Sequence, residues 1–112
     1  MPLSPYRVLD LTQANGVLCA QILGDLGANV IQIEPPEGAA GRRLAPFDNN
    51  HPNDPEHSLF WWSYSCGKRS LVLDIDKDQA TFQKLVAQAD FLIESFKPGF
   101  LPSIGLGYEE LV

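Results

Sequence analysis

The chain has 112 residues, enough for one domain with one hydrophobic core. Fourteen acidic residues against eight basic ones give a formal net charge of −6, which argues against nucleic acid or an anionic membrane surface as a partner. No apolar run approaches the ~18 residues that a membrane helix needs, and the N-terminus lacks the features of a signal peptide, so we expect a cytoplasmic protein.

The first part of the chain predicts a βαβ unit. An apolar strand at residues 8–11 is followed by a short polar turn and then by a helix at residues 17–26. Gly27 can adopt the left-handed conformation that ends a helix, and a second strand follows at residues 29–34. The helix is apolar nearly all round, so we expect it to be buried on most sides.

Residues 35–57 form a long loop that contains five prolines and shows no hydrophobic periodicity. A loop of this length in a compact domain is commonly a lid, a binding loop or an arm that packs on another chain, and a mobile linker is the alternative. Arg42 and Arg43 are its only basic residues, so they are its candidates for binding a phosphate.

The same loop holds both histidines of the chain, His51 and His57, with Asp54 and Glu56 between them. A metal site is one hypothesis for this group. However, structural zinc sites usually use four nitrogen or sulfur ligands, and a flexible Pro-rich loop is a poor frame for them. We therefore expect solvated loop histidines and no metal site.

The next segment is rich in aromatic residues and then in basic ones. Residues 58–64 contain four aromatic side chains, so we expect one to enter the core while another meets a ligand or a partner chain. Residues 67–70, Gly-Lys-Arg-Ser, are similar to a phosphate-binding loop. That motif, however, needs a glycine where Trp62 stands and a helix where a strand follows. We therefore expect a solvated basic turn at residues 67–70.

The last part of the chain predicts two more strands, at residues 71–75 and 91–96, with a helix between them. Asp76 followed by Gln79 has the form of a capping box, with Asp76 as the N-cap of that helix. Short helical segments follow near Val112.

These elements together predict an α/β fold with a parallel sheet of about four strands and flanking helices. Only two full helices are available to cover both faces of the sheet, so we expect the fold to be incomplete as a stand-alone domain. In such a sheet, ligands bind outside the carboxyl ends of the strands, which here means residues 12–16 and 34–36.

Short blocks of the sequence follow one another in the order and near the spacing found in one known family. The blocks are Arg7–Thr12, Gly24–Val30, Glu34–Pro36, Gly67–Ser70 with Leu73–Asp74, Ala89–Asp90, Glu94–Gly99 and Gly105–Tyr108. Together they resemble the N-terminal part of the family III CoA-transferases, which include formyl-CoA transferase, carnitine CoA-transferase and α-methylacyl-CoA racemase. The resemblance implies that residues 1–112 are the N-terminal segment of a CoA-binding, Rossmann-like domain in a protein about three to four times longer.

The resemblance also implies a function. In this family two subunits interlock as a homodimer, and a carboxylate nucleophile attacks the acyl-CoA thioester to give a mixed anhydride. The chain would contribute CoA binding and dimer assembly to an acyl-CoA:carboxylate CoA-transferase or an acyl-CoA racemase, with CoA or acyl-CoA as substrate and no permanently bound cofactor. The family's aspartate lies beyond the last matching block, so we assign no catalytic residue here and expect structural roles for Asp10, Asp25, Asp74 and Asp90.

Several contacts with CoA follow from the resemblance. Gln13 and Ala14 correspond to the first strand-to-helix turn, where the family places residues against the cofactor and the thioester. Leu73 and Asp74 correspond to the end of the third strand, which lines the adenine pocket. Phe96 corresponds to the aromatic residue after the fourth strand.

The phosphates of CoA need cations, and this sequence lacks some that the family carries. Some members have arginine or lysine where Pro35, Asp76 and Ser103 stand. We therefore expect basic residues from nearby positions to replace them, namely Arg42, Arg43, Lys77 and Lys97.

Two alternatives remain open. One is a non-catalytic CoA-binding or assembly module on the same scaffold. The other is a dinucleotide-binding oxidoreductase domain with Glu34 on the ribose. That domain needs a G-x-G-x-x-G motif in the first turn, where residues 13–18 offer only Gly16.

Overall fold

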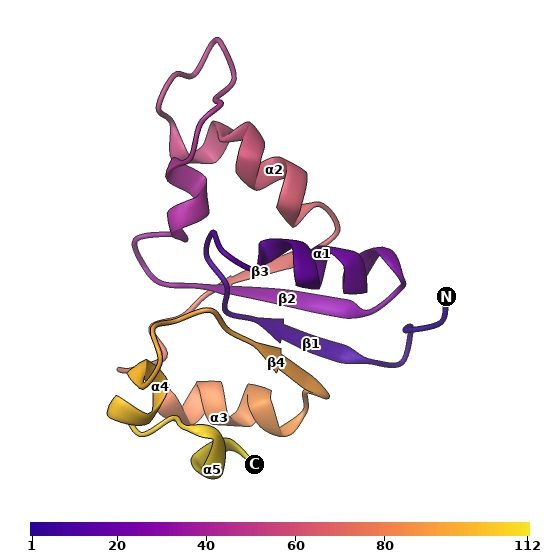
Figure 1. The fold of residues 1–112 in the computed structure, drawn as a ribbon, viewed down its shortest axis with the longest axis vertical. Coiled ribbons are helices and arrows are strands. Elements are labelled where there is room, and N and C mark those ends of the chain that lie inside the picture. The colour runs from indigo at the N-terminus through magenta and orange to yellow at the C-terminus, as the bar shows by residue number, and fades with distance from the viewer.

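A computed structural model, which describes all 112 residues, is built around one sheet of four parallel strands in the order β3-β2-β1-β4 (Figure 1). The strands are β1 (Arg7–Asp10), β2 (Asn29–Glu34), β3 (Arg69–Val72) and β4 (Phe91–Ile93). Val8 of β1 lies opposite Val30 of β2 on one side and Phe91 of β4 on the other. The predicted α/β fold with a parallel sheet of four strands is confirmed.

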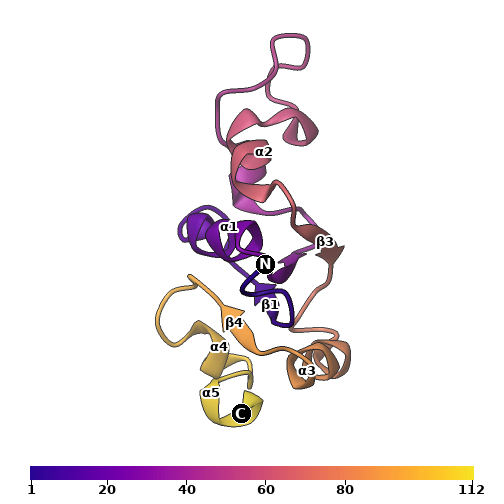
Figure 2. The same cartoon turned by 90° about the vertical axis from the view of Figure 1, so that its right-hand side faces the viewer.

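Helices cover the two faces of the sheet in separate groups. On one face lie α1 (Val17–Asp25) and α2 (Leu59–Ser65). On the other face lie α3 (Gln79–Ala87), α4 (Phe100–Ser103) and α5 (Tyr108–Leu111), as Figures 1 and 2 show. The longest helices, α1 and α3, have nine residues each, and no helix combines the length and apolar character needed to cross a membrane.

Side-chain alternation along the strands divides the core between these faces. The cluster under α3 and α4 consists of Leu9, Leu11, Ile33, Phe82, Leu101 and Leu106. The cluster under α1 consists of Val8, Ala20, Ala28 and Val30. Because Val8 and Asp10 share a face, the carboxylate of Asp10 points to the side of the sheet that α1 and α2 cover.

The outer face of α1 is exposed. Leu18, Ile22 and Leu26 repeat every four residues and are 52%, 48% and 43% exposed. The prediction that this helix is buried on most sides is therefore wrong for these 112 residues. The predicted end of the helix is confirmed, because Gly27 has a φ of 107°, in the left-handed region.

α2 holds the aromatic residues in fixed positions. The Ser58 hydroxyl accepts a hydrogen bond from the Trp61 N–H at 3.2 Å, which caps the helix. Trp61 is buried against Val17 and Ala39, whereas Trp62 is 46% exposed. The prediction that one aromatic side chain enters the core is confirmed, and contact of another with a ligand or partner stays a prediction.

The segment between β3 and α3 differs from its prediction. β3 spans Arg69–Val72 and not residues 71–75, because the pairing with β2 begins at Arg69. Asp78, and not Asp76, is the N-cap of α3, and its carboxylate accepts from the Thr81 N–H at 3.4 Å. Asp76 does not cap the helix, because residues 74–77 form a turn in which the Asp74 carboxylate accepts from the N–H groups of Asp76 and Lys77, and α3 begins only at Gln79.

β4 is shorter than the predicted strand at residues 91–96. It ends at Ile93, and the Glu94 carboxylate then accepts from the Phe96 N–H at 2.8 Å. This local hydrogen bond turns the chain away from the sheet, so Phe96 lies beyond the carboxyl end of the strand.

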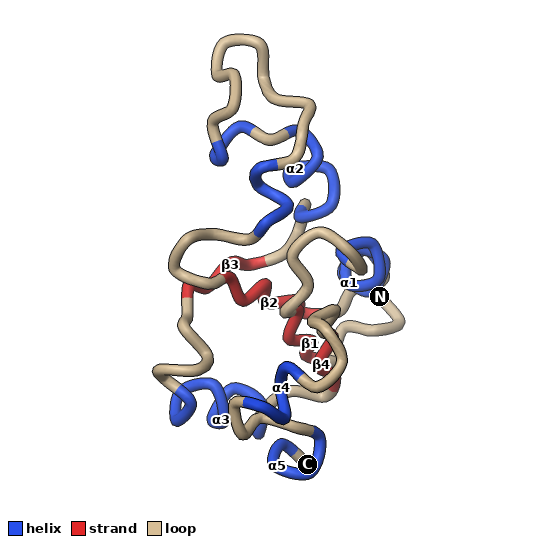
Figure 3. Tube along the Cα trace, turned by 60° about the vertical axis from the view of Figure 1, so that its left-hand side comes forward, coloured by secondary structure: helices blue, strands red, loops and turns tan.

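The long loop at residues 35–57 is packed at its base. It contains two short 3₁₀ helices, η1 (Ala40–Arg43) and η2 (Pro55–His57). Gly41 donates its N–H to the Gln13 carbonyl at 2.7 Å, and the Ser58 hydroxyl donates to the Leu44 carbonyl at 2.7 Å. The loop then projects beyond α2 (Figure 3). These contacts contradict the mobile-linker alternative for the base of the loop.

Candidate functional site

A cleft of about 210 Å³ lies at the carboxyl ends of the strands. Four connecting segments supply its walls, one after each strand. The lining residues are Leu11, Gln13, Ile33, Pro35, Pro36, Glu37, Leu73, Asp74, Ile75, Asp76, Phe96 and Phe100. The position is the one where open parallel sheets bind their ligands.

The cleft combines an apolar, partly aromatic wall with acidic groups. The rings of Phe96 and Phe100 lie 4.8 Å apart between centroids and are tilted by 45°. The lining includes three acidic residues, Glu37, Asp74 and Asp76, and no basic residue. Such a lining suits a flat heterocycle with amino groups better than it suits a phosphate.

The carboxylate of Asp74 is oriented by the backbone. Its Oδ1 accepts from the N–H groups of Asp76 and Lys77, each at 3.1 Å. Both hydrogen bonds fall on the same oxygen, so Oδ2 can accept a hydrogen bond from a ligand.

The structure brings some of the predicted CoA contacts together and leaves others apart. Gln13, Leu73, Asp74 and Phe96 line the cleft. Three more directly follow lining residues in the chain without lining the cleft themselves, namely Ala14, Lys77 and Lys97. The remaining two, Arg42 and Arg43, lie in η1, outside the lining of the cleft.

Arg42 is held by an internal partner. Its Nε and Nη2 donate to the two oxygens of Glu34, at 2.6 and 2.8 Å, and its guanidinium lies 5.3 Å from the centre of the Trp61 ring. Its Nη1 faces the Glu56 carboxylate at 3.8 Å. A phosphate bound by Arg42 would therefore compete with Glu34 or Glu56. Arg43 donates to the carbonyl of Glu37 at 2.6 Å.

Glu34 is fully occupied by protein groups. Besides Arg42, it accepts from the Ser70 hydroxyl at 2.6 Å and the Ala39 N–H at 3.0 Å, and it is 2% exposed. Burial alone would raise the pKa of Glu34, but the hydrogen bonds from Arg42, Ser70 and Ala39 outweigh it and lower the pKa to about 2. Glu34 is therefore not free to bind a ribose, which removes the residue that the oxidoreductase alternative required.

A buried ion pair lies on the face of the sheet that α1 and α2 cover. Lys68 Nζ is 2.8 Å from Asp10 Oδ2, and the two side chains are 1% and 0% exposed. The same ammonium donates to the Val17 carbonyl at 3.1 Å and lies 3.5 Å from Gln32 Oε1. The expectation of a solvated basic turn is wrong for Lys68. The sequence carried one signal for this pair, because a charged residue such as Asp10 inside a buried apolar strand requires a partner.

The network around Asp10 fixes the turn that leads into the cleft. Asp10 Oδ1 accepts from the backbone N–H of Thr12 at 2.9 Å. The amide of Gln32 donates to the carbonyl of Thr12 at 2.6 Å. Thr12 directly precedes Gln13, so the ion pair and Gln32 together position a residue that lines the cleft.

The other aspartates weighed as nucleophiles also have partners in the fold. Asp25 accepts from the Gln21 amide at 3.0 Å, and Asp90 accepts from the Arg7 N–H at 2.8 Å. With Asp10 and Asp74, all four accept hydrogen bonds from other groups of the chain.

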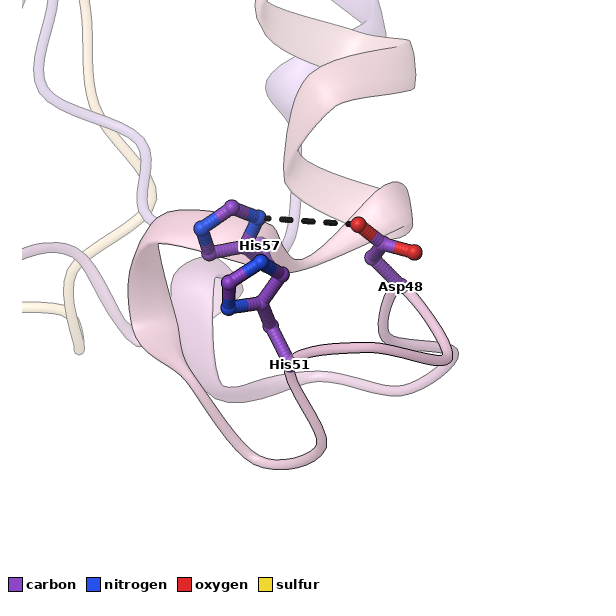
Figure 4. A group of neighbouring side chains, drawn as sticks. All are labelled: Asp48, His51 and His57. Carbon is purple, nitrogen blue, oxygen red and sulfur yellow. Dashed lines mark ion pairs between the residues drawn. The ribbon is translucent and has the colours of Figure 1, made fainter.

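Possible metal ligands come together in the projecting part of the long loop and not in the cleft. Asp48, His51 and His57 each offer one ligand atom, and these atoms lie within 4.8 Å of one another (Figure 4). The sequence predicts solvated loop histidines. The side chains of His51 and His57 are 46% and 28% exposed, and their rings stack with centroids 3.7 Å apart.

Comparison with protein families gives one match over almost the whole chain. The family described as CoA-transferase family III matches residues 3–112. The chain is 39% identical over 110 residues to the succinyl-CoA:(R)-benzylsuccinate CoA-transferase subunit BbsE of Thauera aromatica, covering 96% of this chain and 27% of that protein. It is also 39% identical over 112 residues to the succinyl-CoA:mesaconate CoA-transferase of Haloarcula hispanica, covering 97% of this chain and 28% of that protein.

Solved structures agree with the sequence matches. The crystal structure of the hypothetical protein Rv3272 from Mycobacterium tuberculosis superposes with a TM-score of 0.82 at 37% identity, over 98% of this chain and 30% of that one. A CAIB/BAIF family protein from Brucella suis superposes with a TM-score of 0.81 at 37% identity, over 99% of this chain and 30% of that one. The chain thus spans less than a third of the length of these relatives.

Proposed function

The chain belongs to CoA-transferase family III, and we propose that it is the N-terminal CoA-binding and dimer-assembly segment of an acyl-CoA:carboxylate CoA-transferase or an acyl-CoA racemase. The observation that carries this function is the cleft at the carboxyl ends of the strands, which gathers Gln13, Leu73, Asp74 and Phe96. The substrate is CoA or acyl-CoA, and the nucleophile is an aspartate outside these 112 residues.

The adenine ring of CoA occupies the aromatic side of the cleft in this proposal. Phe96, beside Phe100, offers a ring face for stacking, and Leu73 offers an apolar contact. The free Oδ2 of Asp74 accepts a hydrogen bond from the adenine amino group. The acidic lining favours placing the neutral base here and the phosphates outside.

The phosphates lie at the rim, next to basic residues. Lys77 and Lys97 directly follow the lining residues Asp76 and Phe96, and both lysines are exposed. Each can form a charge-assisted bond with a phosphate oxygen. Arg43 remains bonded to the carbonyl of Glu37. Arg42 can bind a phosphate only if its interactions with Glu34 and Glu56 break.

The reaction takes place at the thioester end of the bound acyl-CoA, away from the adenine ring. The external aspartate attacks the thioester carbonyl, the bond to sulfur breaks, and an acyl-aspartyl anhydride and a CoA thiolate result. The present segment holds the thiolate near the first turn, with Gln13 and Ala14 against the reacting group. We also propose that the protein is a cytoplasmic homodimer whose subunits interlock.

A second candidate is a non-catalytic CoA-binding or assembly module on the same scaffold. The internal use of Arg42 and the acidic lining of the cleft favour it, because they weaken the hold on phosphates. The two candidates differ in acyl transfer by the protein that contains this segment, and in how tightly the phosphates of CoA are expected to be held.

Calorimetric titration of the folded chain with CoA, 3′-dephospho-CoA and NAD tests the binding function. We expect saturable binding of CoA that weakens without the 3′-phosphate, and weaker binding of NAD. A chain that is folded by circular dichroism and gives no heat with CoA would overturn the assignment of the cleft to CoA.

A further inference from the structure

The projecting part of the long loop places four potential metal ligands at every third position. They are Asp48, His51, Asp54 and His57. Backbone hydrogen bonds connect each to the next: the N–H of His51 donates to Asp48, that of Asp54 to His51, and that of His57 to Asp54, at 2.9, 3.3 and 2.8 Å. The Asp48 N–H then donates to the His57 carbonyl at 3.0 Å and closes the ring. This part of the loop is therefore a closed set of turns.

The side chains form an open series, in which acids and imidazoles alternate. His57 Nδ1 lies 3.8 Å from Asp48 Oδ2, and His57 Nε2 lies 3.8 Å from Asp54 Oδ2. His51 Nδ1 lies 4.0 Å from the same oxygen of Asp54. Figure 4 shows the two imidazoles face to face with the carboxylate of Asp48 beside them. All these separations are too long for hydrogen bonds.

One of the imidazole nitrogens lacks a partner. His57 Nδ1 is buried and makes no hydrogen bond, which is unfavourable for a polar atom. Its separation of 3.8 Å from Asp48 Oδ2 is close to that of two ligands of one tetrahedral zinc ion, which lie roughly 3.4 Å apart when each bond is ~2.1 Å. A metal ion bound between them would satisfy both groups.

The loop also supplies a frame for such a site. His57 is 28% exposed on its side chain, its ring lies 5.6 Å from that of Trp62, and the next residue, Ser58, caps α2. Phe47 and Ser58 form an isolated antiparallel bridge on either side of the ring of turns. The Pro-rich loop is thus anchored at the point where the ligands meet.

We propose that Asp48, His51 and His57 bind one divalent transition-metal ion of the zinc type, with the fourth position open to water. Two imidazoles and one carboxylate form a ligand set that zinc accepts. The stacked rings are only 8° from parallel, so their nitrogen lone pairs do not converge on one point. Binding therefore turns one ring, and His51, 46% exposed on its side chain, is the one free to turn.

Titration with zinc chloride, against a chromophoric chelator in metal-free buffer, tests the site on the intact chain. We expect one Zn²⁺ per chain, a higher melting temperature and shifted ring resonances for both histidines. His51→Ala and Asp48→Asn should each weaken binding at least about tenfold. His51 is exposed, so its variant should stay folded, which circular dichroism can confirm.

Two controls separate this site from others. The chain has free, exposed thiols at Cys19 and Cys66, and a Cys19→Ser/Cys66→Ser variant should bind zinc as tightly as the parent. Glu109→Gln, a change at an exposed acid in α5, should also leave binding unchanged. No saturable binding by the folded chain, or binding that survives His51→Ala or disappears with the thiols, would overturn the proposed site.

Discussion

The ammonium of Lys68 lies 2.8 Å from the carboxylate of Asp10, and both side chains are buried. The two residues are 58 positions apart in the sequence, so the ion pair joins β1 to the turn that precedes β3. It lies on the face of the sheet that α1 and α2 cover. Stability and the geometry of the first turn both depend on it.

Lys68→Met should lower the free energy of unfolding by about 3–5 kcal/mol, because Asp10 would remain as a buried charge without a partner. Urea denaturation followed by circular dichroism measures the change. Lys84→Met is the matched control, since Lys84 is exposed on α3 and has no ion pair within 4.0 Å. Adding Asp10→Asn to Lys68→Met should recover part of the loss. Equal effects of Lys68→Met and Lys84→Met would contradict a structural role for the pair.

The bonds to Glu34 predict how stability depends on pH. The pKa of Glu34 is lowered from 4.5 to about 2, so the folded state favours its charged form. The stabilisation is complete above pH 4.5 and is lost as the pH falls from about 4.5 toward about 2. It amounts to no more than about 3 kcal/mol.

Unfolding in urea at a series of pH values checks this dependence. Glu34→Gln should destabilise the chain at neutral pH. The difference in free energy of unfolding between this variant and the parent should shrink as the pH approaches 2.5. Glu37→Gln, at an exposed position nearby, should show the same dependence of the free energy of unfolding on pH as the parent. A Glu34→Gln difference that stays constant from neutral to acidic pH would count against the charged hydrogen bonds as its cause.

The cleft predicts that Phe96 carries part of the affinity for CoA. Base–aromatic stacking is worth roughly 1–3 kcal/mol, so Phe96→Ala should weaken CoA binding about 5- to 150-fold. Calorimetry gives the dissociation constants. Phe91→Ala is the control, because Phe91 is 51% exposed on β4, pairs with the ring of Tyr6 and lies outside the lining of the cleft. Equal affinities of the two variants would show that the base does not stack on Phe96.

Gly41 sits where no side chain fits. A Cβ at this position would lie 2.4 Å from the Gln13 carbonyl oxygen and 2.6 Å from a ring carbon of Trp61. Gly41→Ala should therefore cost about 1–3 kcal/mol of stability and displace Gln13 from the cleft, which weakens CoA binding. Thermal unfolding and calorimetry together test both effects.

Gly24→Ala should have the opposite effect on stability from Gly41→Ala. Its Cβ would meet only Val30 Cγ2, at 3.5 Å, and the residue lies inside α1. The change should stabilise the chain by up to about 1 kcal/mol, because alanine loses less backbone entropy in a helix. If Gly41→Ala and Gly24→Ala changed the free energy of unfolding in the same direction, the close approach of Gly41 to Trp61 would not explain the effect of Gly41→Ala.

The sequence was sufficient for the order of elements and the place of the cleft. Apolar periodicity located the strands, and the rule for open parallel sheets then pointed to residues 12–16 and 34–36 at one edge. The resemblance to the family, and not periodicity, pointed to Gln13, Leu73, Asp74 and Phe96, which line the cleft there. Local signals were less reliable at the ends of elements. Asp76 and Asp78 are both plausible caps, and only the turn held by Asp74 decides between them.

Contacts between distant segments could not be predicted from the sequence. Lys68 lies in a polar tetrapeptide that is typical of a solvated turn, and its burial depends on Asp10 in the first strand. Likewise, His51 and His57 stack because a series of backbone turns closes the loop, and no pattern of residue types specifies that closure.

The backbone of Thr12 is fixed on both sides. Its N–H is bonded to Asp10, and its carbonyl is bonded to Gln32. The turn that precedes α1 is therefore ordered before any ligand arrives, and binding need not restrict it further. Little conformational entropy is lost there on association, so the contacts between Gln13 and a bound CoA are not offset by the cost of ordering this turn.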